Sequence, residues 1–253
     1  MRRHTIAAPL LVALLALAAC GGSDDGGSTD ADGTTTTTSG GGEVAVEPTE
    51  SAGPAPALVA RANAAEVQVY ATASEDEPTA TLDNPNENGA PLVFLVEEDQ
   101  GDWLKVLLPV RPNGSTGFVR ASDVTVSENP YSIDIELAEH RLTVSKGDEV
   151  LIDEPIGVGT ASTPTPGGKY YLKELLQPPD PNGTYGPYAY GLSGFSNVLE
   201  EFNGGPGVIG IHGTNQPEAI GTDVSHGCIR VSNEAITEMA GILPLGTPVH
   251  IAD

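Results

Sequence analysis

Two histidines and a cysteine lie close together near the end of the chain, and their side chains are suited to acyl-transfer chemistry. His212 precedes Cys228 by sixteen residues, and His226 precedes it by two. A cysteine attacks as the thiolate, and a neighbouring imidazole is the usual group that removes the thiol proton. The pattern therefore predicts that Cys228 is a nucleophile working with a histidine.

Two short apolar runs are placed to bring these side chains together. The sequence Val-Ile-Gly-Ile at 208–211 runs directly into His212, which predicts a buried strand ending at that histidine. Apolar and polar residues alternate over 229–232, directly after Cys228, which predicts a second strand. We expect the two strand ends to hold the thiol and the imidazole side by side, with residues 214–224 as the loop between them.

A structural role and a zinc-binding role for the cysteine both fit the sequence less well. A free cysteine is often a small buried apolar side chain, but a histidine two residues before it and a glycine one residue before it are not typical of that role. A zinc site normally has four ligands, whereas only His212, His226 and Cys228 gather here. We therefore expect no metal, and no cofactor is predicted.

The first twenty residues resemble a bacterial lipoprotein signal. Arg2 and Arg3 precede an apolar run over 7–19, and the segment ends in Leu-Ala-Ala-Cys at Cys20. The alternative is an ordinary secretory signal that contains a cysteine by chance. The resemblance implies lipidation of Cys20 and an extracytoplasmic protein anchored to the membrane and facing the cell wall. Cys228 then has no partner for an intramolecular disulfide, because the chain has 2 cysteines.

The composition excludes one class of partner. The chain has 11 Lys and Arg against 35 Asp and Glu, a formal net charge of −24. Nucleic-acid binding needs a basic surface, so we expect none. Residues 21–60 are rich in Gly, Ser, Thr, Asp and Pro and too poor in apolar residues to form a core, which predicts a disordered linker.

The remaining sequence predicts two domains, both mainly β. Residues 64–127 contain short alternating runs between turn residues. Gly-Asp-Trp-Leu-Lys-Val at 101–106 and Gly-Phe-Val-Arg at 117–120 resemble the paired strands of bacterial SH3-like barrels, with Trp103 as a core anchor. Residues 131–253 predict a β-sandwich with one short helix over 234–242.

The second domain resembles the L,D-transpeptidase catalytic domain of bacterial cell-wall enzymes. The resemblance rests on His-Gly at 212–213, followed after a loop by Ser-His-Gly-Cys-Ile-Arg at 225–230, with a Thr-Pro-rich turn at 159–168 before a strand. It implies that Cys228 is the nucleophile and His212 the general base and proton donor. The backbone carbonyl of Gly213 takes the place that an acidic side chain has in other triads.

The resemblance also implies roles for the residues around the nucleophile. His226 supports the turn and the tetrahedral intermediate, and the backbone N–H groups of Gly227 and Cys228 are candidate oxyanion donors. Ser225 is expected to hydrogen-bond within the turn and to contact substrate.

Two further residues are predicted to bind substrate. Arg230 is a candidate partner for a stem carboxylate, with a solvent-facing strand arginine as the alternative. Tyr188 belongs to a Gly- and Pro-rich segment, 181–197, that is expected to cover a groove, although a surface loop that packs on itself is equally consistent with this composition.

The function implied by the resemblance is cross-linking of peptidoglycan tetrapeptide stems through a cysteine acyl-enzyme. It also implies that a carbapenem, a β-lactam, acylates Cys228. Two alternatives stay open: an L,D-carboxypeptidase or hydrolase of the same fold, and an inert peptidoglycan-binding lipoprotein. The sequence does not separate an amine acceptor from water, because that choice depends on the shape of the acceptor groove.

Overall fold

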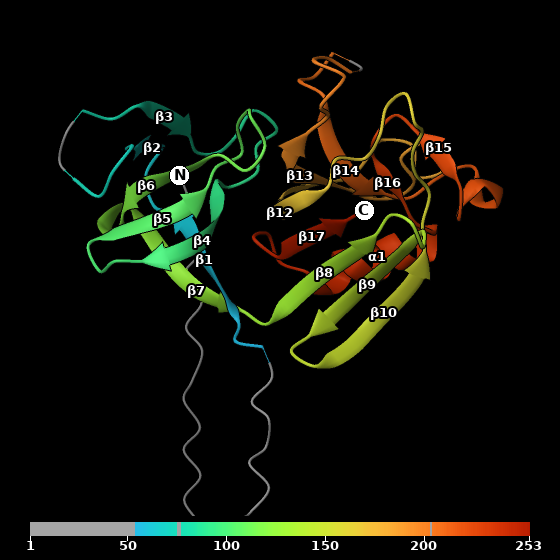
Figure 1. Cartoon of the computed structure of the whole chain (residues 1–253), viewed down its shortest axis with the longest axis horizontal. Coiled ribbons are helices and arrows are strands. Elements are labelled where there is room, and N and C mark those ends of the chain that lie inside the picture. Colours follow the sequence, from blue (N-terminus) through green and yellow to red (C-terminus); the bar gives the residue numbers. More distant parts are fainter. Residues whose placement is uncertain (1–53, 75–76, 203) are drawn as a thin grey trace, which may run out of the picture. The chain divides into compact units, whose positions relative to one another are not determined.

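The computed structural model describes residues 54–74, 77–202 and 204–253, all of which belong to one compact unit, Glu50–Asp253. The predicted signal, its Cys20 and most of the predicted linker lie outside these residues. The described part is mainly β with one α-helix (Figure 1), as the sequence predicts.

The first part of the described chain forms a five-stranded sheet and a separate hairpin. The sheet has the order β6-β5-β4-β1-β7, and β2 pairs with β3. The strands are β1 (Ala57–Ala62), β2 (Glu66–Val69), β3 (Ala80–Asp83), β4 (Val93–Asp99), β5 (Trp103–Leu107), β6 (Thr116–Arg120) and β7 (Val124–Asn129). The tryptophan strand β5 pairs with β6 as expected, with Trp103 opposite Arg120. The SH3-like identity of this region stays a prediction.

Strand β1 corrects the predicted end of the linker. We expected the linker to reach residue 60, whereas β1 begins at Ala57 and pairs with both β4 and β7. Local composition did not reveal this strand, because it is a short, alanine-rich stretch stabilised by two neighbours from later in the chain.

Trp103 is not the core anchor that we expected. The core of the first sheet contains Phe94, Leu104 and Val106, each at most 1% exposed, whereas Trp103 is half-buried at its rim. The indole meets the Tyr70 ring edge-on at 5.0 Å between centroids, and the Arg120 guanidinium lies 4.9 Å from its ring.

The second part of the chain forms an eight-stranded sheet. Its order is β10-β9-β8-β17-β12-β13-β14-β16. The strands are β8 (Tyr131–Glu136), β9 (Arg141–Lys146), β10 (Glu149–Pro155), β12 (Gly168–Leu176), β13 (Ala189–Phe195), β14 (Val208–His212), β16 (Ile229–Arg230) and β17 (Pro248–Ala252). A further pair, β11 (Val158–Gly159) with β15 (Asp223–Ser225), is parallel.

The helix α1 (Asn233–Ile242) follows the short strand β16 and is capped by Ser232. Ser232 accepts a hydrogen bond from the Ala235 N–H at 3.0 Å, which satisfies one of the free donors at the helix start. Ala235, Ile236 and Met239 are buried in the main core. This packing fixes the start of α1 beside β14, the strand that carries His212.

A small apolar cluster joins the two sheets. Val59, Leu95 and Leu107 of the first sheet pack with Tyr171 of β12, which is fully buried. Apolar burial of this kind is the main stabilising contribution to domain contacts, so the first sheet is held against β12, which β13 separates from β14 in the second sheet.

Candidate active site

Pairing of β14 with β16 places the predicted nucleophile and base on one face of the sheet. The strands are parallel, with Ile211 opposite Ile229 and His212 opposite Arg230. Cys228 therefore lies one position before this pairing, next to Gly210. Because side chains alternate between faces along a strand, the cysteine, histidine and arginine share the face opposite the buried isoleucines.

His212 is held rigidly at the end of β14. It is 4% exposed, and its Nδ1 lies 2.6 Å from the carbonyl oxygen of Gly213. A carbonyl only accepts, so Nδ1 carries the proton and Nε2 presents a lone pair. The structure thus shows the contact that was predicted for the Gly213 carbonyl.

Asn233 supports this arrangement from the first residue of α1. Its Oδ1 accepts a hydrogen bond from the Thr214 N–H at 2.8 Å. A Cβ at position 213 would collide with this same oxygen, so Gly213 is required for close approach. Asn233 was not among the predicted site residues, because its contact with Thr214 exists only once α1 is packed.

Burial decides the charge state of both reactive groups. The pKa of His212 is lowered to about 4, mainly by desolvation; the Gly213 hydrogen bond opposes this change and the Arg230 charge adds to it. Burial also raises the pKa of the Cys228 thiol, although a Gly210 backbone hydrogen bond and Arg230 oppose this. The resting pair at neutral pH is therefore a thiol and a neutral imidazole, the state in which the imidazole can act as a general base.

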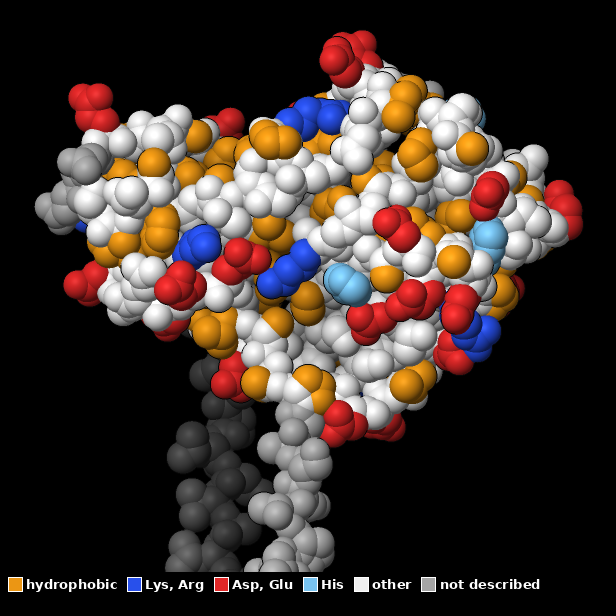
Figure 2. Space-filling model, viewed as in Figure 1, with side chains coloured by type: hydrophobic (Ala, Val, Ile, Leu, Met, Phe, Trp, Pro, Cys, Tyr) orange, Lys and Arg blue, Asp and Glu red, His pale blue; other side chains and the backbone are white. Residues whose placement is uncertain are grey.

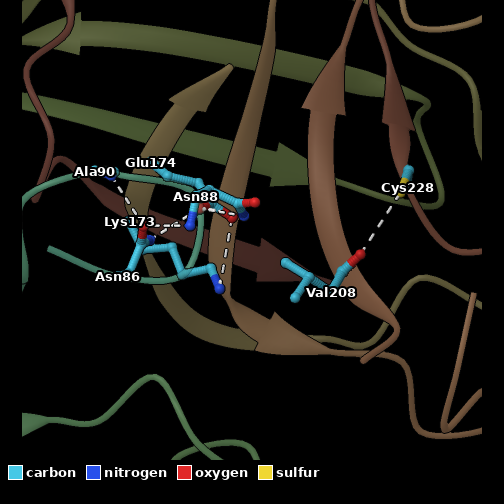
Figure 3. Close-up of polar contacts among 7 residues, drawn as sticks. All are labelled: Asn86, Asn88, Ala90, Lys173, Glu174, Val208 and Cys228. Carbon is cyan, nitrogen blue, oxygen red and sulfur yellow. Dashed lines mark hydrogen bonds and ion pairs between the residues drawn. The ribbon is translucent and has the colours of Figure 1, made fainter. Parts of the chain in front are cut away.

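The Cys228 thiol points toward the start of β14 (Figure 3). Its Sγ lies 4.0 Å from the carbonyl oxygen of Val208, a weak contact within the range for sulfur. This carbonyl marks one wall of the space around the thiol, since Val208 lines both of the cavities that reach Cys228.

The turn before the cysteine is closed by its own hydrogen bonds. The Ser225 hydroxyl donates to the Cys228 carbonyl at 2.5 Å and accepts from the Gly227 N–H at 3.0 Å. Gly227 has φ of +119°, a conformation that strongly favours glycine.

These bonds bear on two predicted roles. Ser225 is buried and its hydroxyl is hydrogen-bonded within the turn, as one half of the prediction stated. It also lines the smaller cavity, and its contact with substrate, the other half, stays a prediction. The Gly227 N–H is likewise engaged and does not serve as an oxyanion donor here. Of the two predicted donors, Cys228 N–H is the one that stays a candidate.

The Thr-Pro-rich turn braces the catalytic turn from the other side. Thr165 Oγ1 accepts from the Gly159 N–H and donates to the Gly227 carbonyl, both at 2.9 Å. The Ser225 carbonyl in turn accepts from the Thr160 N–H at 3.1 Å. Thr165 lies in the Thr-Pro-rich turn at 159–168, but it was not among the predicted site residues.

Arg230 lies directly beside the reactive pair. It faces His212 in the register, and its Nη1 donates to Gln216 Oε1 at 3.0 Å. Its Nε is buried and has no hydrogen-bond partner among the described residues. This geometry favours the predicted anion contact over a solvent-facing strand arginine.

Two cavities meet at the reactive pair. The smaller has a volume of about 180 Å³ and the larger about 740 Å³, and Cys228, His212, Val208 and Tyr185 line both. Arg230 lines the smaller cavity, whereas the larger extends to Glu174 of β12.

Of Tyr185 and Tyr188, Tyr185 is the one that lines these cavities. The Tyr185 ring meets the His212 ring edge-on at 4.8 Å between centroids. Tyr188 packs against the main core and lines neither cavity at the thiol, while its carbonyl accepts the Gly213 N–H at 3.4 Å. Both tyrosines occur in the same Gly- and Pro-rich segment, so composition alone did not distinguish them.

His226 has different surroundings from His212. It is exposed, and its ring lies 5.4 Å from that of Phe202 between centroids. It lines the smaller cavity together with Phe202. The geometry is consistent with the predicted supporting role, and no hydrogen bond among the described residues fixes its tautomer.

Among the described residues, no group of three or more His, Cys, Asp and Glu is arranged to bind a metal ion. No helix in this part of the chain is both long and apolar enough to cross a membrane. Figure 2 shows acidic side chains dispersed over the visible face, with Lys and Arg in small, separate groups.

Known proteins match the part of the chain that contains this site. Residues 130–251 match the family profile described as YkuD, L,D-transpeptidase catalytic domain. The putative L,D-transpeptidase YkuD of Bacillus subtilis is 38% identical over 151 residues, which cover 57% of this chain and 84% of that protein. The probable L,D-transpeptidase ErfK/SrfK of Escherichia coli is 29% identical over 196 residues, covering 68% of this chain and 63% of that protein.

Among solved structures, the chain is similar to an L,D-transpeptidase from Mycobacterium smegmatis. The sequence identity is 17% and the TM-score is 0.41, and the match covers 65% of this chain and 92% of the other.

Proposed function

The chain belongs to the L,D-transpeptidase family, and from that premise we propose that it cross-links peptidoglycan stem peptides through a Cys228 acyl-enzyme. The observation that carries this proposal is the shared position of Cys228 and His212 on two cavities, with the imidazole fixed by the Gly213 carbonyl.

Acylation begins from the neutral pair. His212 Nε2 takes the thiol proton as Sγ attacks the carbonyl carbon of the third stem residue, forming a tetrahedral intermediate. The imidazolium then gives the same proton to the amine of the departing D-Ala, and the third residue is left as a thioester on Cys228. Proton transfer in step with attack avoids placing a separated charge pair in a buried site.

Deacylation reverses these roles with a second stem. Its amine attacks the thioester carbonyl while Nε2 accepts the amine proton. The thiolate then leaves and recovers that proton from the imidazolium, so His212 ends each cycle neutral. The Cys228 N–H is proposed to stabilise the oxyanion in both half-reactions.

Two cavities that meet at one thiol suit a reaction with two substrates. We assign the donor stem to the smaller cavity, where Arg230 is available to pair with a stem carboxylate, and the acceptor stem to the larger. An inert binding protein would have no need of a buried thiol beside an oriented imidazole. A hydrolase would need the first cavity only.

The proposed location is the outer face of the cytoplasmic membrane. This part of the proposal rests on the resemblance of residues 1–20 to a lipoprotein signal with Cys20 as the lipidated residue. Labelling of the wild type but not of Cys20→Ala by a radioactive fatty acid would support it, and equal release of both proteins from washed membranes would contradict it.

The experiment that tests the activity is intact-protein mass spectrometry with a disaccharide-tetrapeptide and a diaminopimelate-containing acceptor. Transpeptidation gives a thioester on Cys228 and then a cross-linked product that has lost the D-Ala of the donor stem. Release of the tripeptide alone, even with abundant acceptor, would assign the hydrolase alternative. Absence of any adduct on a folded protein would overturn the enzyme assignment.

A further inference from the structure

The loop between β5 and β6 grips a segment of the catalytic region. Arg111 Nη1 donates to the Ser196 carbonyl at 2.7 Å, and its Nη2 donates to the carbonyls of Leu199 and Pro206, each at 3.0 Å. One guanidinium thus holds three backbone carbonyls that are distributed along the connection from β13 to β14.

Asn113 adds a reciprocal pair at the end of β13. Its Nδ2 donates to the Phe195 carbonyl at 2.7 Å, and the Phe195 N–H donates to its Oδ1 at 2.9 Å. The Arg111 guanidinium also lies 4.9 Å from the Phe195 ring, within the range of a cation–π contact. The primary amide imitates the backbone of a neighbouring strand, so it fixes the point at which the segment leaves the sheet.

The gripped segment forms a wall beside the nucleophile. Ser196, Leu199 and Gly207 line the smaller cavity, and the segment leads directly into Val208, whose carbonyl lies 4.0 Å from Cys228 Sγ. Displacement of this wall would therefore change the space in which the donor stem meets the thiol.

A second loop, which connects β3 to β4, holds Glu174 of β12 (Figure 3), a residue that lines the larger cavity. The side-chain amides of Asn86 and Asn88 both donate to Glu174 Oε2 at 2.9 Å, and Lys173 Nζ lies 3.5 Å from Oε1. Glu174 is 3% exposed and lines that cavity together with Asn88. Both cavities thus have walls that depend on side chains of the first sheet.

We propose that Arg111 and Asn113 are positioning residues for acyl transfer. In this proposal, the loop between β5 and β6 of the first sheet helps to set the geometry of the active site. The inference rests on the proposed function, because it concerns how the donor stem reaches Cys228. Arginine is suited to this role because its planar fork orients several acceptors at once, whereas lysine offers a single point charge.

The test compares Arg111→Ala, Arg111→Lys and Asn113→Ala with Arg61→Ala, a control that removes an exposed arginine of β1. We expect Arg111→Ala to slow acylation by the tetrapeptide about 10- to 100-fold, because a small misplacement of a positioned group has effects of this size. Arg111→Lys should recover part of the rate, and Arg61→Ala should match the wild type.

Two readouts separate positioning from general destabilisation. Iodoacetamide is small enough to react with Cys228 without being positioned by this wall. Its rate of reaction with Cys228 should therefore be unchanged in all four variants. Backbone hydrogen exchange in residues 195–202 should become faster in Arg111→Ala and Asn113→Ala, while exchange in β8 and β9 stays as in the wild type.

Failure of this inference is distinct from failure of the proposed function. If the wild type forms no acyl-enzyme with the tetrapeptide, the proposed function fails, and the exchange comparison still tests whether the first sheet holds the wall. If folded Arg111→Ala acylates and exchanges like the wild type, the positioning role is overturned. Should that variant not fold, wild-type acylation and exchange in Arg111→Lys and Asn113→Ala would overturn it equally.

Discussion

His212 and His226, the two histidines near Cys228, differ in almost every property that matters for catalysis. His212 is buried at the end of β14, with Nδ1 bonded to the Gly213 carbonyl and an aromatic neighbour in Tyr185. His226 is exposed and lies beside the Phe202 ring. The histidine nearer in sequence to Cys228 is therefore the one with the less constrained ring.

This difference shows that orientation of the imidazole requires a closed environment. A base must present a lone pair in a fixed direction, and that requires a partner for the other nitrogen and exclusion of competing water. Proximity in sequence supplies neither, whereas the end of a buried strand supplies both. Substitutions in and around the catalytic turn test this difference between the two histidines.

Removal of the nucleophile should have the largest effect. Cys228→Ala is expected to abolish turnover and also the adduct with a carbapenem, because no other group near the cavities can form the thioester. The unfolding midpoint should stay close to that of the wild type, since the change removes a single atom. Intact mass and a thermal melt measure both, with Cys228→Ser as a variant of nearly the same shape. Residual cross-linking by a well-folded alanine variant would contradict the assignment of Cys228.

Loss of His212 should have the next largest effect. His212→Ala is expected to slow acylation about 100- to 10,000-fold, which is the usual contribution of a positioned general base. Single-turnover measurement with the tetrapeptide assigns the loss to acylation. Wild-type rates in this variant would remove His212 from the mechanism.

Burial of His212 also predicts a pH dependence of folding. Its pKa is about 4 in the folded protein against the ordinary 6.5. The unfolded chain thus binds more protons between these values, and stability is lost as pH falls through this window. The full difference is about 3 kcal/mol. Urea unfolding of the wild type at pH 7 and pH 4.5, compared with His212→Gln, measures the contribution. An equal pH response in both proteins would show that the imidazole is not held neutral by burial.

The Ser225 hydroxyl should contribute less than the buried imidazole. Ser225→Ala leaves the buried Gly227 N–H and the Cys228 carbonyl without their partner. Loss of such a partner is expected to destabilise the protein by about 1–3 kcal/mol. The exposed Ser122→Ala provides the control and should stay within about 0.5 kcal/mol of the wild type. Equal stability of the two variants would mean that the turn does not depend on this hydroxyl.

His226→Ala should have the smallest effect. We expect acylation to fall by less than about tenfold, because an exposed side chain with one ring neighbour contributes little to orienting the thiol. Its thiol pKa, measured by the pH dependence of iodoacetamide reaction, should match the wild type. A loss as large as that of His212→Ala, together with a changed thiol pKa, would reverse the two assignments.

Much of the site was predictable because it is local in sequence. The apolar run before His212 and the alternation after Cys228 predicted two strands that the structure contains, and the Ser-His-Gly-Cys-Ile-Arg motif indicated the proposed nucleophile and base. The carbonyl of Gly213 was also predictable, since it belongs to the next residue. The strand order around these elements was not, because alternation predicts which face of a strand is buried and leaves its neighbours open.

Other features depended on contacts between distant segments. The choice of Tyr185 over Tyr188, the use of the Gly227 N–H by Ser225 and the neutral state of the thiol follow from which groups are buried together. The start of the first sheet at Ala57 depended on pairing with strands that come later.

The amino-acid sequence specifies which atoms can react and in which order they occur along the chain. Their charge, their orientation and the cavity walls around them arise only when the chain folds. Chemical identity is carried by each residue, whereas the pKa of a buried group and the shape of a cavity are set by its neighbours. Arg111 and Asn233 are such neighbours, and they reach the segments around the site only after folding.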